Sequence, residues 1–328
     1  MEDRPKRRER GDLRNRILAA GSAILLLLLL LFSFTGPGAA FWGRLMSLAG
    51  HNGISDVALD APLNIHVLDV GKADAILIEC EGQSLLLDGG TVDKGDKVSD
   101  YLTRRGIGKL DCIVSSHPDK DHIGGLPQVL QEHGARLFCH PALAEEILPH
   151  TDEFLALEAV LKETGTEQSV QTPGSVYSLG GAKLTFLAPL REYDNTNDSS
   201  LVFKLSYGDF TALFCGDMEE EAEEDLVASG IDLNADLLKV SHHGSNTSST
   251  KKFLKAVSPR YAVISVGPDK NNLPQKKVLR RLENFDAEIY RTDIDGTVIF
   301  SYDGEAITVY TETVSYTHLR AHETRGNL

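Results

Sequence analysis

The sequence predicts an α/β protein in which layered sheets carry helices on their outer faces. Two observations predict this fold class. Strand-like and helix-like stretches alternate from about residue 63 to residue 311, as layered α/β folds require. Polar residues follow directly after several apolar runs, which is where open sheets present functional groups. With 328 residues and 41% hydrophobic residues, the chain can bury the core of one large domain or two small ones.

The periodicity of apolar residues predicts each element in order. Strands are expected at 64–70, 75–80, 84–87, 112–115, 184–187, 201–206, 210–215, 236–240 and 261–266, and two or three short strands complete the fold near residue 311. Helices are expected at 98–105, 126–133, 142–148, 154–163, 218–229, 251–257 and 276–284.

The N-terminal region predicts a membrane anchor. Residues 1–16 form a basic tail with seven Lys or Arg and four Asp or Glu, and the apolar stretch 17–34 has no charge. Its 18 residues are at the lower limit for spanning a bilayer. The basic tail should stay in the cytoplasm, so that the following chain is exported. A cleaved signal peptide is the alternative.

The remaining boundaries follow from composition. Residues 35–62 have scattered Gly and Pro and weak periodicity, as in a linker. The folded domain is expected over 63–313. The tail 314–328 has no apolar period, resembles a translated sequencing adapter, and is left out of the mechanism.

Charge limits the classes of partner. The net charge is −15, and without the first sixteen residues, which carry +3, it is −18. Such acidity argues against a tight, static nucleic-acid ligand, since affinity for phosphates comes mainly from basic side chains. It does not exclude an enzyme that meets phosphate through metal ions.

The four cysteines are not spaced as zinc ligands. Cys80, Cys112, Cys139 and Cys215 form no C-x-x-C pair, so a zinc knuckle or a thioredoxin-like site is not expected. Core packing is the favoured interpretation of their apolar surroundings, and a disulfide stays open.

The segment from His117 to His122 carries the strongest chemical signal. Two imidazoles and two carboxylates, those of His117, Asp119, Asp121 and His122, fall within six residues between an apolar run and a Gly-Gly pair. Nitrogen and oxygen donors of this kind are the ligands of hydrolytic metal sites. A polar loop at a helix N-terminus is the simpler alternative, but four such donors are rarely packed together without a metal.

Four further strand ends carry polar residues that can join this segment. Asp88 ends one strand, Asn197 lies just before another, Asp217 follows a third, and His242 and His243 end a fourth. A single such residue is weak evidence, because turns are rich in Asp and Asn. Four strand ends together with the central segment predict one polar site.

These motifs together resemble the metallo-β-lactamase fold, an αββα sandwich of two mixed sheets with helices on the outer faces. The family signature H-x-H-x-D-H reads here as His117-x-Asp119-x-Asp121-His122. The Asp at its second position, with the segments 68–71, 197–202 and 241–245, resembles the ComEC-type branch of bacterial competence (DNA uptake) proteins. The chain would correspond to a standalone domain of that branch, without its channel domain.

The resemblance implies roles for individual residues. One metal would be held by His117 and Asp119, with Asn197 in the place of a further ligand, and a second by Asp121, His122 and one of the pair His242 and His243, with Asp217 bridging both. His242 is the expected ligand because it comes first after the strand, and His243 is expected to line the substrate pocket. Catalysis is expected to involve Asp121, His243 and Asp74, and ligands would be oriented by Asp88, Asp69, Asp198 and Ser245.

Two departures from the branch change what can be expected. The segment usually reads D-V-G-Q-G-D, whereas here it runs Asp69-Val70-Gly71-Lys72-Ala73-Asp74, which adds a cation near the site. A later His-Pro is replaced by Leu273-Pro274, so that a substrate or acid–base contact is missing.

The resemblance implies a hydrolase with two divalent ions, Zn²⁺ or Mn²⁺, that activate a water. Phosphodiesters, including nucleic acid as a substrate, rank first. A lactone, lactam or small ester ranks second, and a metal-poor binding or scaffold subunit is the alternative from another class. The expected location is a bacterial membrane, with the catalytic domain outside the cytoplasm or secreted after cleavage. The sequence leaves the oligomeric state open.

Overall fold

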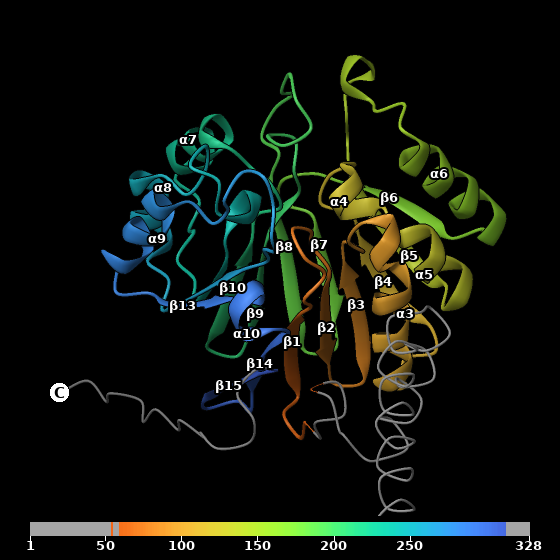
Figure 1. Ribbon diagram of the computed structural model, residues 1–328, viewed down its shortest axis with the longest axis horizontal. Helices are drawn as coiled ribbons and strands as arrows, with labels where there is room; N and C mark the ends of the chain where they lie inside the picture. The colour runs from red at the N-terminus through yellow and green to blue at the C-terminus, as the bar shows by residue number, and fades with distance from the viewer. Residues whose placement is uncertain (1–53, 55–58, 313–328) are drawn as a thin grey trace, which may run out of the picture. The chain divides into compact units, whose positions relative to one another are not determined.

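The computed structural model describes Ile54 and residues 59–312 (Figure 1). The expected basic tail, the 17–34 span, most of the linker and the 314–328 tail lie outside these residues. Within the part that is described, no helix is both long enough and apolar enough to cross a membrane.

Fifteen described strands form two mixed sheets. The eight-stranded sheet has the order β15-β14-β1-β2-β3-β4-β5-β6, and the seven-stranded sheet has the order β13-β12-β11-β10-β9-β8-β7. The strands are β1 (Leu63–Val67), β2 (Ile76–Cys80), β3 (Gln83–Leu87), β4 (Leu110–Val114), β5 (Ala135–Pro141), β6 (Glu167–Gln171), β7 (Val176–Leu179), β8 (Ala182–Ala188), β9 (Val202–Tyr207), β10 (Phe210–Phe214), β11 (Leu237–Lys239), β12 (Tyr261–Ile264), β13 (Glu288–Arg291), β14 (Val298–Tyr302) and β15 (Ile307–Thr311).

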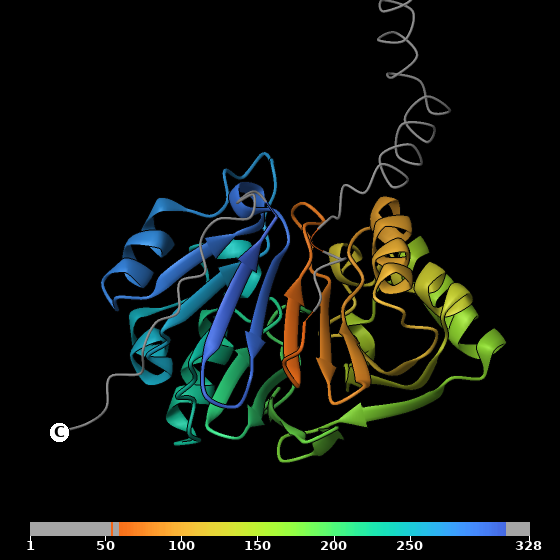
Figure 2. The same ribbon diagram turned by 90° about the horizontal axis from the view of Figure 1, so that it is seen from below.

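Helices cover the outer face of each sheet. The α-helices are α3 (Gly95–Arg104), α4 (Lys120–Ile123), α5 (Leu126–Glu132), α6 (Asp152–Thr164), α7 (Glu220–Ala228), α8 (Lys251–Val257), α9 (Lys276–Glu283) and α10 (Thr292–Asp295). Short 3₁₀ helices are η2 (Val92–Lys94), η3 (Glu145–Ile147) and η4 (Ser241–Gly244). Figure 2 shows the four layers edge-on, with α3, α5 and α6 beside one sheet and the helices of the C-terminal half beside the other.

Three apolar clusters hold these layers together. The central one lies between the sheets and includes Phe186, Phe203 and Phe214, the last two stacked with ring centroids 4.8 Å apart. Burial of such a side chain stabilises the fold by about 1.5–3 kcal/mol. The other two clusters lie between each sheet and its helices. The expected α/β sandwich of two mixed sheets with outer helices is therefore confirmed.

Most expected elements are present, with boundaries that differ by a few residues. The helix expected over 142–148 is wrong, because only the single turn η3 forms between Pro141 and Pro149. Three strands were not expected, namely β5, β6 and β7. Strand β6 reads Glu-Gln-Ser-Val-Gln and lies at a sheet edge, so its polar composition does not show the alternation of a half-buried strand.

All four cysteines are free thiols buried in the core, in agreement with the packing interpretation. They come from both sheets, and none lies in the polar site described below.

Candidate metal centre

The central segment forms a tight loop between β4 and α4. Asp119 precedes the helix in an extended conformation, and its carbonyl accepts hydrogen bonds from the amides of His122 and Ile123. This turn returns the chain on itself, so that the rings of His117 and His122 lie with centroids 4.1 Å apart. Both histidines are completely buried. The local sequence therefore brings two of the expected ligands together.

Glycines allow a second loop to approach this one closely. A Cβ at Gly125 would collide with the carbonyl oxygen of Gly89, and a Cβ at Gly89 would collide with Leu126. The turn after β3 thus packs directly against the start of α5. As a result the carboxylate of Asp88 lies 2.8 Å from Nδ1 of His122 and accepts hydrogen bonds from the amide and hydroxyl of Ser116.

Three buried histidines share one arrangement. In each, Nδ1 contacts a protein group: Ser116 Oγ at 3.0 Å for His117, Asp88 at 2.8 Å for His122, and the Ser265 carbonyl at 2.8 Å for His243. In each, Nε2 is buried and has no hydrogen-bond partner. A metal-binding histidine has this form, with one nitrogen fixed by the protein and the other free for the ion.

Two carboxylates complete the cluster. Asp217 Oδ2 lies 3.3 Å from His122 Nε2 and 3.6 Å from His243 Nε2, and its Oδ1 is buried without a partner. Asp121 Oδ2 lies 3.6 Å from His243 Nε2. The described ligand atoms fall into overlapping groups within 4.8 Å of one another, which are His117/His122/Asp217, Asp121/His122/His243 and Asp74/Asp88/His122.

These atoms fit a divalent metal. Buried polar atoms without partners are costly, and here they are nitrogen and oxygen donors that converge on one place. Buried donors that make no hydrogen bond in the protein are available to an ion. The site can therefore hold divalent metal, in agreement with the expected cofactor class.

The charges of the cluster are strongly coupled. Burial disfavours protonation of His122, but the carboxylates of Asp217 and Asp88 outweigh it and raise the pKa of His122 well above its usual value. Burial alone would raise the pKa of Asp217, yet His122 and His243 hold it well below the usual range. Burial and the neighbouring His122 lower the pKa of His117. Asp217 is therefore ionised, as a metal ligand must be.

The histidine pair does not leave an extended strand. His242 and His243 have φ of 48° and 51°, so both adopt the left-handed conformation within η4. His242 was expected as the ligand because it comes first after the strand, but these two residues do not continue the strand in an extended conformation. The buried His243 lies inside the cluster. His242 is 22% exposed, with Nδ1 3.0 Å from Glu219 Oε1 and Nε2 3.9 Å from Asp217 Oδ2.

The expected ligands on the other side of His117 are more open. Asp119 Oδ2 lies 3.9 Å from His117 Nε2, and Thr196 donates a hydrogen bond to its other oxygen at 2.7 Å. The amide oxygen of Asn197 is buried without a hydrogen-bond partner. This side of the cluster is thus richer in oxygen than in nitrogen.

Of the four residues expected to orient ligands, only Asp88 contacts a cluster histidine. Asp198 accepts hydrogen bonds from the amides of Glu219 and Ala222 and so supports the start of α7. Asp69 accepts one from the Gly71 amide, and Ser245 contacts Thr247 at 2.9 Å. These three residues therefore shape loops around the site.

A buried ion pair behind the cluster was not expected. Lys239 is 1% exposed and donates to Asp74 Oδ2 at 2.8 Å, and Asp74 Oδ1 lies 3.9 Å from His243 Nδ1. The pair joins a loop of one sheet to a strand of the other. The signal in the sequence was a single lysine within the apolar run Leu237-Leu238-Lys239-Val240.

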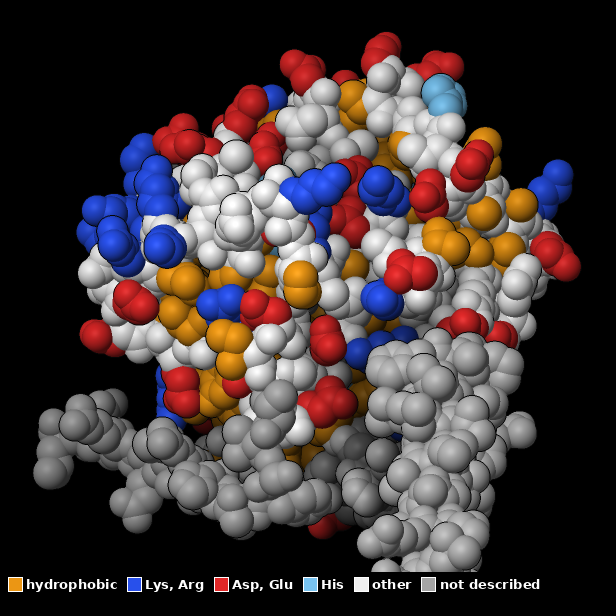
Figure 3. All heavy atoms as spheres, in the orientation of Figure 1, with side chains coloured by type: hydrophobic (Ala, Val, Ile, Leu, Met, Phe, Trp, Pro, Cys, Tyr) orange, Lys and Arg blue, Asp and Glu red, His pale blue; other side chains and the backbone are white. Residues whose placement is uncertain are grey.

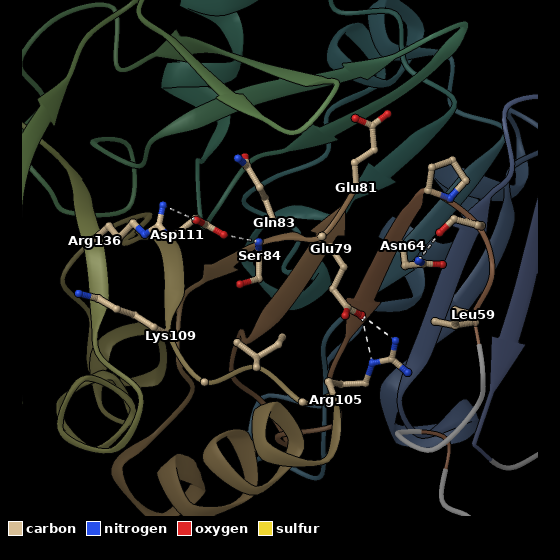
Figure 4. A pocket seen from close by; sticks show the side chains of 16 residues that line it. Leu59, Asn64, Glu79, Glu81, Gln83, Ser84, Arg105, Lys109, Asp111 and Arg136 are labelled. Atoms are coloured by element: carbon tan, nitrogen blue, oxygen red, sulfur yellow. Dashed lines mark hydrogen bonds and ion pairs between the residues drawn. The ribbon is translucent and has the colours of Figure 1, made fainter.

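The surface around the cluster is distinct from a polar hollow elsewhere on the molecule. Figure 3 shows acidic side chains gathered in the upper centre of the face, with basic side chains beside them. A polar hollow of about 580 Å³ lies at the opposite ends of β3 and β4 (Figure 4). Its arginines are paired, Arg105 with Glu79 at 3.1 Å and Arg136 with Asp111 at 3.3 Å. This polar hollow is therefore separate from the metal centre.

Comparisons with known proteins agree with this geometry. The model of the metallo-beta-lactamase superfamily matches residues 68–267. ComE operon protein 3 of Bacillus subtilis is 29% identical over 260 residues, covering 73% of this chain and 33% of that protein. Competence protein ComA of Neisseria gonorrhoeae is 30% identical over 289 residues, covering 87% of this chain and 38% of that protein. The chain spans about a third of the length of these relatives.

Among solved structures, CmlA, a diiron β-hydroxylase from Streptomyces venezuelae, is similar in fold. Its TM-score is 0.50 at 12% sequence identity, over 75% of this chain and 55% of that chain.

The fold and the convergent donors define a metal-dependent hydrolase. The chain belongs to the metallo-β-lactamase superfamily, as the match over residues 68–267 shows, and its curated relatives are competence proteins of the ComEC type.

Proposed function

We propose that this chain is an exported, membrane-anchored hydrolase that uses two divalent ions to cleave phosphodiester bonds. One observation carries the proposal: the buried Nε2 atoms of His117, His122 and His243 gather around Asp217, and none of them has a hydrogen-bond partner. Such an arrangement is expensive in a protein that binds no ion, because each unpaired buried group loses its hydration.

The donors divide into two sets. His117 and Asp119 would hold one ion, with Asn197 beside it, and Asp121, His122 and His243 would hold the second. Asp217 would bridge both. We assign His243 rather than His242 to the second ion, because His243 is buried and its Nε2 lies 3.6 Å from both Asp121 and Asp217. Oxygen donors near His117 suit Mn²⁺ as well as Zn²⁺.

When bound, such ions lower the pKa of a shared water and neutralise charge on a phosphoryl group. The chain's own residues fix the geometry. Asp88 and the Ser265 carbonyl hold the rings of His122 and His243 in place through their Nδ1 atoms. His242, whose Nδ1 contacts Glu219 at the open side, is positioned to give a proton to a leaving group.

Relatives support the substrate class. The name of competence protein ComA refers to competence, and that of recombination protein 2 of Haemophilus influenzae refers to recombination, processes that handle nucleic acid. The acidic charge of the chain, −15, argues for contact with phosphate through ions rather than through a basic surface.

The test uses the full-length protein in detergent. Metal content and hydrolysis of bis-p-nitrophenyl phosphate are measured with Mn²⁺, with Zn²⁺ and after chelation. We expect about two ions per chain and turnover that chelation abolishes. A chain without bound metal and without metal-stimulated hydrolysis would support the scaffold alternative instead.

Hydrolysis of lactones or small esters is the second candidate, favoured by one observation. A hollow of about 380 Å³ with mainly apolar walls, including Phe138 and Leu157, lies next to Ser115 and Pro118, which flank the His117 loop. An apolar part of a substrate would fit there. Turnover of p-nitrophenyl butyrate or of an acyl lactone without turnover of phosphodiesters would move this candidate to first place.

The location is tested separately. The basic residues 1–16 and the apolar residues 17–34 would leave the catalytic domain outside the cytoplasm. Protease added to intact cells should then degrade the domain. Protection until the membrane is opened would contradict export.

A further inference from the structure

Lys72 places a positive charge next to Asp121, one of the proposed metal ligands. Its Nζ lies 2.6 Å from Asp121 Oδ2, and its side chain is 26% exposed. Asp217 and Asp269 lie near enough to act on its charge as well. The lysine is therefore part of the cluster's electrostatics and still open to solvent.

The backbone holds Lys72 in this position. The amide of Asp74 donates to the carbonyl of Asp121 at 3.1 Å, and the amide of Gly71 donates to Asp69 at 3.2 Å. A Cβ at Gly267 would lie 2.6 Å from the Cα of Gly71, so the loop is packed against the segment after β12. The backbone position of Lys72 is therefore fixed, and only its flexible side chain can move.

The lysine and a metal ion require the same oxygen. Asp121 Oδ2 is the atom that Lys72 contacts at 2.6 Å and also the atom that lies 3.6 Å from His243 Nε2. An ion held by Asp121 and His243 would lie a few ångströms from the ammonium group. At that separation two positive charges repel strongly in a partly buried site.

We infer that Lys72 is a tethered cation that competes with a divalent ion for Asp121, and that the displaced ammonium group then binds an anionic oxygen of the substrate. The inference rests on the proposed metal centre. It makes binding of the ion at Asp121 and binding of the substrate anion mutually favourable, because the anion gives the displaced lysine a new partner.

Lys239 cannot take this role, although it also carries a charge near the cluster. It is 1% exposed and donates both to Asp74 at 2.8 Å and to the carbonyl of Val240 at 3.1 Å. Lys72, in contrast, extends from a loop at the surface. Its removal should leave the core packing unchanged.

The first experiment measures Mn²⁺ binding by titration calorimetry on the full-length protein and its Lys72→Gln variant. Lys120→Gln is the matched control, because Lys120 lies between the proposed ligands Asp119 and Asp121 and its side chain is exposed. We expect Lys72→Gln to bind the weaker of the two ions at least about tenfold more tightly, since a like charge is removed. Lys120→Gln should bind as the unchanged protein does.

The second experiment repeats the titration with methylphosphonate. The anion should tighten binding of the weaker ion in the unchanged protein by severalfold, and this gain should be reduced in Lys72→Gln. Unchanged or weaker Mn²⁺ binding by Lys72→Gln would overturn the competition, and an equal effect of the anion on both proteins would overturn the transfer to substrate. Absence of Mn²⁺ binding in all three proteins would instead refute the proposed metal centre.

Discussion

Polar groups lie at both ends of the central strands, but they are unpaired at one end and paired at the other. Where β3, β4, β10 and β11 end, buried nitrogen and oxygen atoms converge without partners. At the opposite ends of β3 and β4, a polar hollow of about 580 Å³ is lined by side chains that include the ion pairs Arg105–Glu79 and Arg136–Asp111. The comparison teaches that unsatisfied buried donors, rather than the size of a hollow, mark the functional end of this molecule.

The largest expected effect comes from Asp217, the carboxylate that we propose bridges both ions. Asp217→Asn keeps the shape but removes the charge that both ions would share. We expect more than about a 100-fold loss in affinity for each ion, beyond the effect of a residue that only orients a ligand. Metal analysis after dialysis and hydrolysis of bis-p-nitrophenyl phosphate measure this. Retention of both ions would show that Asp217 does not bind metal.

Variants of His242 and His243 test which of the two side chains binds metal. His243→Ala should lose one ion, with about a 100-fold loss in affinity, because its Nε2 faces both carboxylates. His242→Ala should keep its metal and lower kcat by at least about 100-fold. The measurement is metal content beside steady-state kinetics. The reverse pattern would exchange the two roles.

The buried pair behind the cluster should affect stability. Lys239→Met leaves the carboxylate of Asp74 uncompensated, which costs about 3–5 kcal/mol. The double variant Lys239→Met with Asp74→Asn should recover a large part of this loss. Urea unfolding of the unchanged protein, of Lys239→Met and Asp74→Asn separately, and of the double variant gives the coupling energy. Additive losses would show that the two side chains do not depend on each other.

Glu223 shows what burial does to a carboxyl group without histidine neighbours. Burial raises its pKa to about 7, and it accepts hydrogen bonds from the amides of Ser249 and Thr250. A carboxyl with a raised pKa stabilises the fold fully below its unfolded value of 4.5, and this stability is lost as pH rises through about 7. Between pH 5 and pH 8 the free energy of unfolding of the unchanged protein should fall by about 2 kcal/mol more than that of Glu223→Gln. Equal losses in urea unfolding would contradict the contrast with Asp217.

The smallest effect is expected at the opposite end. Arg136 is 73% exposed and its pair with Asp111 lies at 3.3 Å, so Arg136→Ala should change the free energy of unfolding by less than about 1 kcal/mol. Hydrolysis and metal content should not change. A clear loss of activity would mean that the polar hollow takes part in the reaction, and the comparison of the two ends would fail.

The sequence by itself determined the residues whose placement is local. The segment from His117 to His122 is a strand end followed by a short helix, so its four donors lie together whatever the rest of the chain does. The central helices and most strands were likewise predicted, because apolar periodicity records which face is buried.

Only the tertiary structure decided how the distant segments meet. The choice between His242 and His243 depends on two left-handed residues that no periodicity reveals. The partner of Lys239 lies in the other sheet, and edge strands such as β6 are held by pairing rather than by an apolar pattern. Contacts of this kind arise from packing between layers, and packing is a property of the whole fold rather than of any one stretch of sequence.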